Sequence, residues 1–134
     1  NTGQPRFARH PRDERAIRAV FAEAQRRFEA NKPEEIGPLL APEFEYRGMD
    51  REQFTGYPAR MRGAYRLPEA TFDCLSFEFS DDQEEAQVRV RVDTGGLFDL
   101  ARPGGRRDTV RLLDVALRRE GGDWRVTTYE LLDD

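Results

Sequence analysis

Apolar side chains recur at helical spacing near the start of the chain. Between residues 12 and 30 they fall at Ile17, Val20, Phe21, Ala24 and Phe28. Because this spacing places all of them on one stripe of an α-helix, a helix that buries this stripe is predicted over residues 12–30.

Two further helices are predicted before residue 68. Pro33 suits the first position of a short second helix, which Pro38 limits. The run from Asp50 to Gln53 resembles a capping box, since the Asp50 carboxylate can accept from the Gln53 amide. A third helix would follow, with a kink near residues 56–58 and one apolar stripe formed by Phe54, Tyr57, Met61 and Tyr65.

After Pro68 the apolar period changes from helical spacing to strict alternation, which indicates β-strands. Strands are predicted over residues 70–79, 86–92, 109–119 and 124–132, with Leu75, Phe77 and Phe79 on one face of the first of them. A shorter strand is predicted at residues 43–47. The order is therefore three helices with one short strand among them, then an antiparallel meander, and this order is typical of the α+β class.

Length and composition fit one globular domain. The chain has 134 residues, and we expect a flexible leader at residues 1–11 and a single domain at 12–134. Only 37% of residues are hydrophobic and 36% are charged, but nine Phe, four Tyr and one Trp can close a core. The sequence holds no apolar run of the roughly 20 residues that a membrane helix needs, so no membrane partner is expected.

Charge and cysteine content exclude several kinds of site. The net charge is −4 and the signs alternate along the chain, so no nucleic-acid partner is expected, and the basic run at residues 60–66 suits a solvated helix face. Cys74 is the only cysteine, which excludes an internal disulfide, and it suits a small buried position. With one His far from it in sequence, neither a metal site nor a cofactor is expected. A cytoplasmic location is slightly favoured, and an exported mature form stays open because the chain does not begin with Met.

Three segments together carry a resemblance to a known family. They are Phe28-Glu-Ala-Asn31 through Leu39-Leu40-Ala41-Pro-Glu-Phe44-Glu-Tyr46-Arg-Gly48, then Asp50-Arg-Glu-Gln-Phe54, and finally Arg118-Arg-Glu-Gly-Gly-Asp-Trp124-Arg-Val126-Thr-Thr-Tyr129. In order and spacing the chain resembles the nuclear-transport-factor-2-like superfamily, and within it the SnoaL-like and ketosteroid-isomerase-like branch. The resemblance implies a cone-like fold in which a strongly curved, mostly antiparallel sheet wraps the three N-terminal helices. It also implies a pocket between helices and sheet, and frequent dimerisation through the outer face of the sheet.

Two sequence features bear on the pocket and on the dimer. Trp124 and Val126 are expected to face the core. Because side chains alternate along a strand, Thr128 and Glu130 should face the same side and approach the pocket. Strand 109–117 is apolar on both faces, whereas a sheet that is open to water on one side should alternate. We therefore expect the helices to cover one face of this strand and a second copy of the chain to cover the other.

The catalytic residues of the resembled isomerases do not carry over. Their carboxylate base falls on Gly48 and their helical Tyr on Ala24, and neither residue can abstract a proton or stabilise an oxyanion. The Arg-x-Asp pattern of epoxide hydrolases of this fold matches Arg91 and Asp93 in letters only, because Val92 takes the inward position.

Asp114 and Glu130 remain as candidate catalytic acids, because a carboxylate in an apolar strand is paired, is raised in pKa or lies in a wet pocket. The candidate ligand-binding residues are Tyr46, Tyr57, Tyr65, Asp114, Trp124, Thr128 and Glu130. The leading hypothesis is a protein that binds a small, partly apolar organic ligand. The alternatives are a cofactor-independent isomerase, dehydratase or cyclase, and a dimeric interaction module whose pocket is filled by its own aromatic side chains.

Overall fold

The computed structural model describes residues 10–30, 32–60, 65–66, 71–93, 97–99, 106–107 and 110–132. Residues 33–34, 57–60, 65–66, 97–99 and 106–107 are described as backbone only. Most of the predicted leader lies outside these ranges.

The first helix is α1 (Pro11–Glu29), and it confirms the predicted amphipathic stripe. Ile17 is fully buried and Phe21 is nearly so. Asp13 and Glu14 lie in the first turn of α1, and Arg26 and Arg27 lie in the last. This distribution of charge complements the helix dipole, so α1 is stabilised at both ends as well as along its buried face.

The second predicted helix is a 3₁₀-helix, η1 (Pro33–Leu39), so the described chain has two α-helices and the expectation of three is corrected. Pro38 lies inside this segment and has no N–H to donate to an α-helical hydrogen bond. Its last turn closes with the shorter 3₁₀ pattern, in which the Leu40 amide donates to the Gly37 carbonyl at 2.9 Å.

The helix α2 (Arg51–Arg60) begins with the predicted capping box. The Gln53 amide donates to Asp50 Oδ1 at 2.8 Å, and the Asp50 amide donates to Gln53 Oε1 at 2.9 Å. The helix ends before residue 65, since Tyr65 and Arg66 form strand β3 (Tyr65–Arg66). The prediction that Tyr65 continues the helical stripe is therefore wrong, and Met61 lies outside the described residues.

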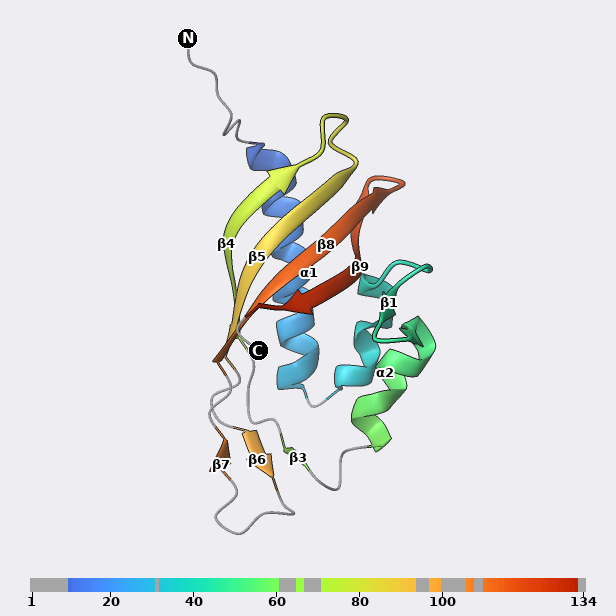
Figure 1. Cartoon of the computed structure of the whole chain (residues 1–134), viewed down its shortest axis with the longest axis vertical. Coiled ribbons are helices and arrows are strands. Elements are labelled where there is room, and N and C mark those ends of the chain that lie inside the picture. The colour runs from blue at the N-terminus through green and yellow to red at the C-terminus, as the bar shows by residue number, and fades with distance from the viewer. Residues whose placement is uncertain are drawn as a thin grey trace.

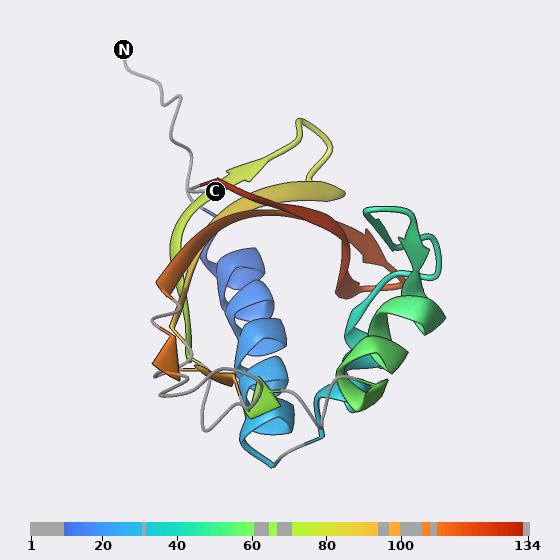
Figure 2. The same ribbon diagram turned by 60° about the horizontal axis from the view of Figure 1, so that its bottom comes forward.

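The main sheet has four antiparallel strands and confirms the predicted meander. They are β4 (Thr71–Phe79), β5 (Glu85–Asp93), β8 (Val110–Glu120) and β9 (Asp123–Leu131), and they lie side by side in chain order. Figure 1 shows the sheet in front of α1, with its outer face toward the viewer. Figure 2 shows the same sheet arching over α1, with α2 beside the open side of the arch. The cone expected from the resemblance is thus present.

Two small sheets accompany the main one, and the sequence predicts only one of their strands, the short one expected at residues 43–47. The strands β1 (Glu45–Tyr46) and β2 (Met49–Asp50) form a hairpin around Arg47 and Gly48. Both turn residues have positive φ, 50° and 81°, as a two-residue hairpin turn requires, and glycine tolerates such a value best. The strand β6 (Leu97–Asp99) pairs with β3 and with β7 (Arg106–Arg107).

Two bulges interrupt the main sheet. The β4–β5 register shifts between Cys74 and Ser76, which leaves Leu75 unpaired and 53% exposed. Leu75 therefore does not share the buried face of Phe77 and Phe79, which corrects the strict alternation predicted for this strand. A second shift between Ala116 and Leu117 leaves a residue of β9 unpaired. Bulges bend a strand and increase its twist, and both contribute to the curvature that makes the cone.

The core lies between the concave face of the sheet and the helices. Its largest fully buried side chains come from α1, from the segment after η1 and from the two central strands. They are Ile17, Phe44, Val88, Val90 and Leu117.

Candidate functional site

At its wide end the cone holds a cavity of about 320 Å³. Val20, Ala24 and Phe28 of α1 form one wall, and Leu113 and Val115 of β8 form part of the opposite one. η1, α2 and β9 complete the lining with Ile36, Leu39, Phe54, Val126, Tyr129 and Leu131. The volume lies at the small end of the range of about 300–1,000 Å³ that is typical of ligand pockets.

Only two of the described side chains that line the cavity carry a polar atom, Arg111 and Tyr129. No carboxylate occurs in this set. A cavity with an apolar wall and very few polar groups holds a ligand by excluding water from it, and its polar groups fix the ligand's orientation.

The Tyr129 hydroxyl belongs to an aromatic cluster at one side of the cavity. The rings of Tyr129 and Tyr46 are stacked at a centroid distance of 4.1 Å, and Phe54 lies edge-on to Tyr129 at 6.0 Å. Burial raises the pKa of Tyr129 well above its usual value, and the neighbouring Tyr46 adds to this increase. The phenol therefore stays protonated at neutral pH and can act as a hydrogen-bond donor or acceptor.

The bulge in β9 decides which residues of this strand reach the cavity. Ala116 pairs with Thr128 and Leu117 pairs with Val126, so Thr127 is the unpaired residue. Beyond it the inward positions are Tyr129 and Leu131, and Thr128 and Glu130 are exposed and do not line the cavity. Thr128 and Glu130 were predicted to face inward by strict alternation from Val126. That prediction is wrong because Thr127 is an extra residue that shifts the alternation by one.

Asp114 lies on the convex face of the sheet. It is half-buried, opposite Arg89 of β5 and Glu130 of β9, while its neighbours Leu113 and Val115 line the cavity. The two candidate acids are therefore brought together, as cross-strand partners, on the opposite side of the sheet from the cavity.

Trp124 belongs to the closed end of the cone. It is 4% exposed, and its ring packs edge-on against Phe79 at 5.9 Å. The guanidinium of Arg119 lies 5.3 Å from the Trp124 ring centroid and forms an ion pair with Asp13 of α1 at 3.1 Å. Trp124 thus joins α1 to the β8–β9 hairpin and does not line the cavity.

Tyr46 is half-buried and reaches the cavity only through its contact with Tyr129. The side chains of Tyr57 and Tyr65 lie outside the described ones. Ala24, which occupies the position aligned with the helical Tyr of the isomerases, lines the cavity with a methyl group. Gly48 is placed in the β1–β2 turn and is not among the lining residues.

Arg91 and Asp93 lie away from the cavity, as predicted. Val92 between them lines it, and the Arg91 guanidinium is 3.7 Å from Asp73 and 3.9 Å from Asp93. The Arg-x-Asp pattern is therefore part of a surface charge pairing on β5 and the neighbouring β4.

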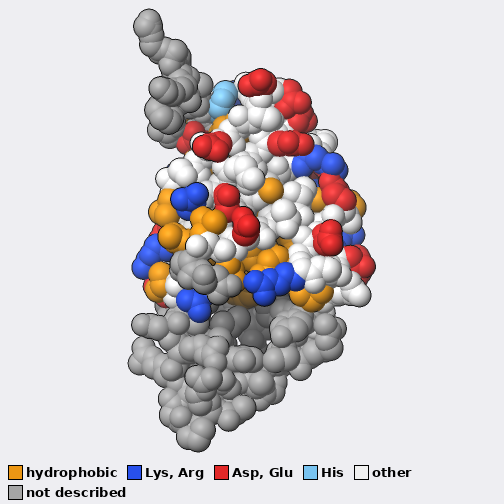
Figure 3. All heavy atoms as spheres, in the orientation of Figure 1, with side chains coloured by type: hydrophobic (Ala, Val, Ile, Leu, Met, Phe, Trp, Pro, Cys, Tyr) orange, Lys and Arg blue, Asp and Glu red, His pale blue; other side chains and the backbone are white. Residues whose placement is uncertain are grey.

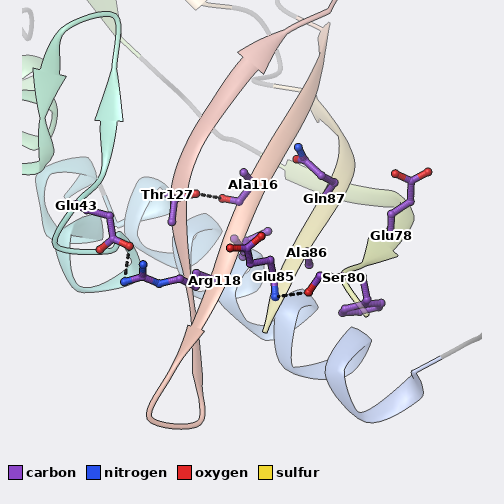
Figure 4. Close-up of a pocket in the computed structure, with 11 residues that line it drawn as sticks. Glu43, Glu78, Ser80, Glu85, Ala86, Gln87, Ala116, Arg118 and Thr127 are labelled. Carbon is purple, nitrogen blue, oxygen red and sulfur yellow. Dashed lines mark hydrogen bonds and ion pairs between the residues drawn. The ribbon is translucent and has the colours of Figure 1, made fainter. Parts of the chain in front are cut away.

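The convex face carries a second hollow, of about 470 Å³ (Figure 4). Glu43, Glu78, Glu85 and Arg118 lie around it. Arg118 forms ion pairs with Glu43 and Glu120, and the hydrogen bond with Glu120 is the main reason for its raised pKa. Figure 3 shows acidic, basic and apolar side chains interspersed on this face. Because the Arg118 guanidinium is already paired within the protein, this hollow is a weaker candidate for ligand binding than the cavity is.

Other chemistry is sparse in the described part of the chain. The thiol of Cys74 is partly buried, and this burial raises its pKa to about 11. No group of three or more His, Cys, Asp or Glu side chains that could hold a metal ion occurs among the described residues. None of the described helices is long and apolar enough to cross a membrane.

Comparison with known proteins identifies the fold. No protein-family model matches the sequence, and no curated protein matches it either. Among solved structures, the protein Aln2 from a Streptomyces species matches with a TM-score of 0.67 at 14% identity, over 92% of this chain and 91% of that one. A putative scytalone dehydratase from Novosphingobium aromaticivorans matches with a TM-score of 0.62 at 16% identity, over 89% and 82%. A protein from Catenulispora acidiphila in complex with S-DNPA matches with a TM-score of 0.61 at 13% identity, over 91% and 93%.

These similarities, together with the curved sheet around α1, show that the chain has the nuclear-transport-factor-2-like fold expected from its sequence. Sequence reasoning missed two of the residues that define its cavity. Arg111 could have been found, because counting back in twos from Leu117, Val115 and Leu113 places it on the inner face. Tyr129 could not, because its position depends on the bulge at Thr127.

Proposed function

We propose that this protein binds a small, mainly apolar organic molecule in the cavity between α1 and the concave face of the sheet. The observation that carries the proposal is the composition of the cavity wall. Two polar side chains stand among fifteen apolar ones in the described lining. Such a wall stabilises an apolar ligand by about 25 cal/mol for each Å² of apolar surface that leaves water.

Acid–base catalysis by Asp114 or Glu130 receives less support from this geometry. A general base must come within hydrogen-bond reach of the proton that it abstracts, directly or through one water. Both carboxylates are on the convex face, across the sheet from the cavity, and the described lining supplies none in their place. Binding alone needs neither group.

The structural neighbours agree with a pocket that takes small molecules. The Catenulispora acidiphila protein is in complex with S-DNPA, and the Novosphingobium aromaticivorans protein is described as a putative scytalone dehydratase. At 13% and 16% identity they share the fold with this chain. They support a role of the cavity in binding small molecules. The kind of ligand is inferred from the residues of this chain that line the cavity.

The test uses N-phenyl-1-naphthylamine, a neutral apolar probe whose fluorescence increases when it leaves water. We expect the wild-type protein to bind it saturably with one site per chain. The substitution Ala24→Phe places a ring into the cavity from the middle of α1, and we expect it to reduce the affinity at least tenfold. The fluorescence titration measures both.

Ala22→Phe is the matched control, because Ala22 is exposed on the same helix and does not line the cavity. It adds the same ring to the same helix and should bind the probe as the wild type does. Overpacking can cost 1–3 kcal/mol, so thermal melts must show that Ala24→Phe is folded at the assay temperature. Absence of saturable binding to the wild type, or equal affinities for the two variants, would refute the proposed function.

A further inference from the structure

Arg111 is the one charged side chain in the described lining of the cavity. It is the second residue of β8 and shares the inward parity of Leu113, Val115 and Leu117. It is exposed although it lines the cavity, so its guanidinium stands where the cavity meets solvent. Leu113, Val115 and Leu117 are aliphatic, so their alternation predicts an aliphatic residue at position 111 as well. A cation there departs from the pattern of this face.

The surroundings of Arg111 offer it no counter-charge among the described residues. Its neighbours on the concave face are Val92, its cross-strand partner on β5, and Leu113. Several other arginines of the described fold are paired, as Arg118 is with Glu43 and Arg119 is with Asp13. No described residue forms an ion pair or hydrogen bond with Arg111, so its five N–H donors face the solvent or a ligand.

We propose that Arg111 selects ligands that carry a carboxylate at one end of an apolar body, an inference that rests on the proposed function. The apolar body occupies the chamber lined by α1 and β8, and the carboxylate stays at the mouth. The planar guanidinium holds a carboxylate through two parallel N–H···O hydrogen bonds. The ligand class is therefore that of medium-chain fatty acids and comparable apolar monocarboxylates.

With the carboxylate at the mouth, neither the carboxylate nor the Arg111 guanidinium has to lose all of its hydration. Moving an ionised carboxylate into an apolar interior is strongly unfavourable, and pairing repays the cost only where the geometry is good. At the mouth the carboxylate keeps part of its hydration while the hydrocarbon loses its contact with water. The Tyr129 ring is half-buried and stacked on Tyr46, and the anionic end of the ligand is held by Arg111.

The experiment measures displacement of N-phenyl-1-naphthylamine by decanoate and by 1-decanol, at pH 8, below the concentration at which decanoate forms micelles and below the solubility limit of decanol. The two competitors share the chain length and differ in the charged group. In the wild type we expect decanoate to compete more strongly than decanol. Arg111→Gln should weaken decanoate about fivefold relative to decanol and the probe, as expected for loss of an exposed ion pair.

Arg89→Gln is the matched control. Arg89 is exposed on β5 between the inward-facing Val88 and Val90, so its side chain lies on the convex face. The substitution therefore removes the same charge from the opposite face of the same sheet. It should leave both competitors unchanged, and Arg111→Lys should retain part of the preference for decanoate. Equal competition by decanoate in the wild type, Arg111→Gln and Arg89→Gln would overturn the role of Arg111 while the probe still binds. Failure of the probe itself to bind the wild type would instead refute the proposed function.

Discussion

At the scale of single residues, the cavity is defined by a few side chains whose positions are not interchangeable. Ala24 is small, and so leaves the space that a larger side chain on α1 would fill. Tyr129 supplies a buried phenol, and Arg111 supplies a cation at the mouth. The residues that carry titratable carboxylates, Asp114 and Glu130, face the other way. A site with these side chains is suited to binding a molecule and less suited to acid–base catalysis on it.

The thiol of Cys74 gives a prediction at this scale. Its pKa of about 11, against an ordinary value of 9.0, arises chiefly from burial, which disfavours the thiolate. At pH 8 the native protein should react with iodoacetamide about a hundredfold more slowly than the urea-unfolded chain, because the thiolate is the nucleophile. Equal rates in the two states would contradict the buried placement.

The same pKa shift has a consequence for stability. The unfolded thiol ionises near pH 9 and the folded one near 11, so the folded state binds the proton more tightly. The protein should therefore lose stability as the pH rises from about 9 to about 11. Cys74→Ala should remove that part of the alkaline loss in a series of urea melts.

At the scale of elements, the sequence predicts regular structure well and its interruptions poorly. The stripe on α1, the Asp50 capping box and the four long strands all follow from spacing that each segment carries within itself. Pro38 indicates where the second helical segment is limited, but whether its turns are α or 3₁₀ depends on local hydrogen bonding. The strand β6 pairs with β3, which lies far earlier in the chain, and with the nearby β7, and all three strands are too short to carry an alternating pattern.

The bulges explain why the fold could be predicted and most of the site could not. An unpaired residue reverses the facing of every side chain that follows it. Val126 before the bulge faces inward as predicted, whereas Thr128 and Glu130 after it do not. The alternation in the sequence is compatible with either register, because Thr127 and Thr128 fit both faces equally well. Only the pairing with Ala116 and Leu117 decides between them.

At the scale of the whole molecule, the core is packed with aromatic side chains where α1 meets the β8–β9 hairpin, and it is hollow further along α1. Trp124, Phe79 and the Arg119–Asp13 ion pair join α1 to the hairpin. Beside the second half of α1 the core keeps a cavity, where Val20 and Ala24 present smaller side chains between Phe21 and Phe28. This division lets one part of the core maintain stability while the other stays available to a ligand.

The convex face bears on the predicted homodimer, which stays a proposal. Val110, Leu112 and Ala116 share this face of β8, and Val110 is 39% exposed. If two copies meet there, sedimentation velocity should report twice the 15.5 kDa of one chain. Leu112→Arg should then shift the protein to monomer, whereas Ala22→Arg on the exposed side of α1 should not. A wild-type chain that sediments as a monomer at about 100 μM would contradict the proposal.

The cavity inside the cone is the proposed binding site. Isotope-filtered NMR with methyl-labelled protein and unlabelled N-phenyl-1-naphthylamine tests it most directly, because each nuclear Overhauser effect joins a ligand proton to a known methyl group. We predict contacts from the probe to Val20, Leu113, Val115 and Leu131, which line the cavity. Contacts confined to Leu75, Val110 and Leu132, which are exposed outside it, would show that the apolar probe binds elsewhere and would contradict the account.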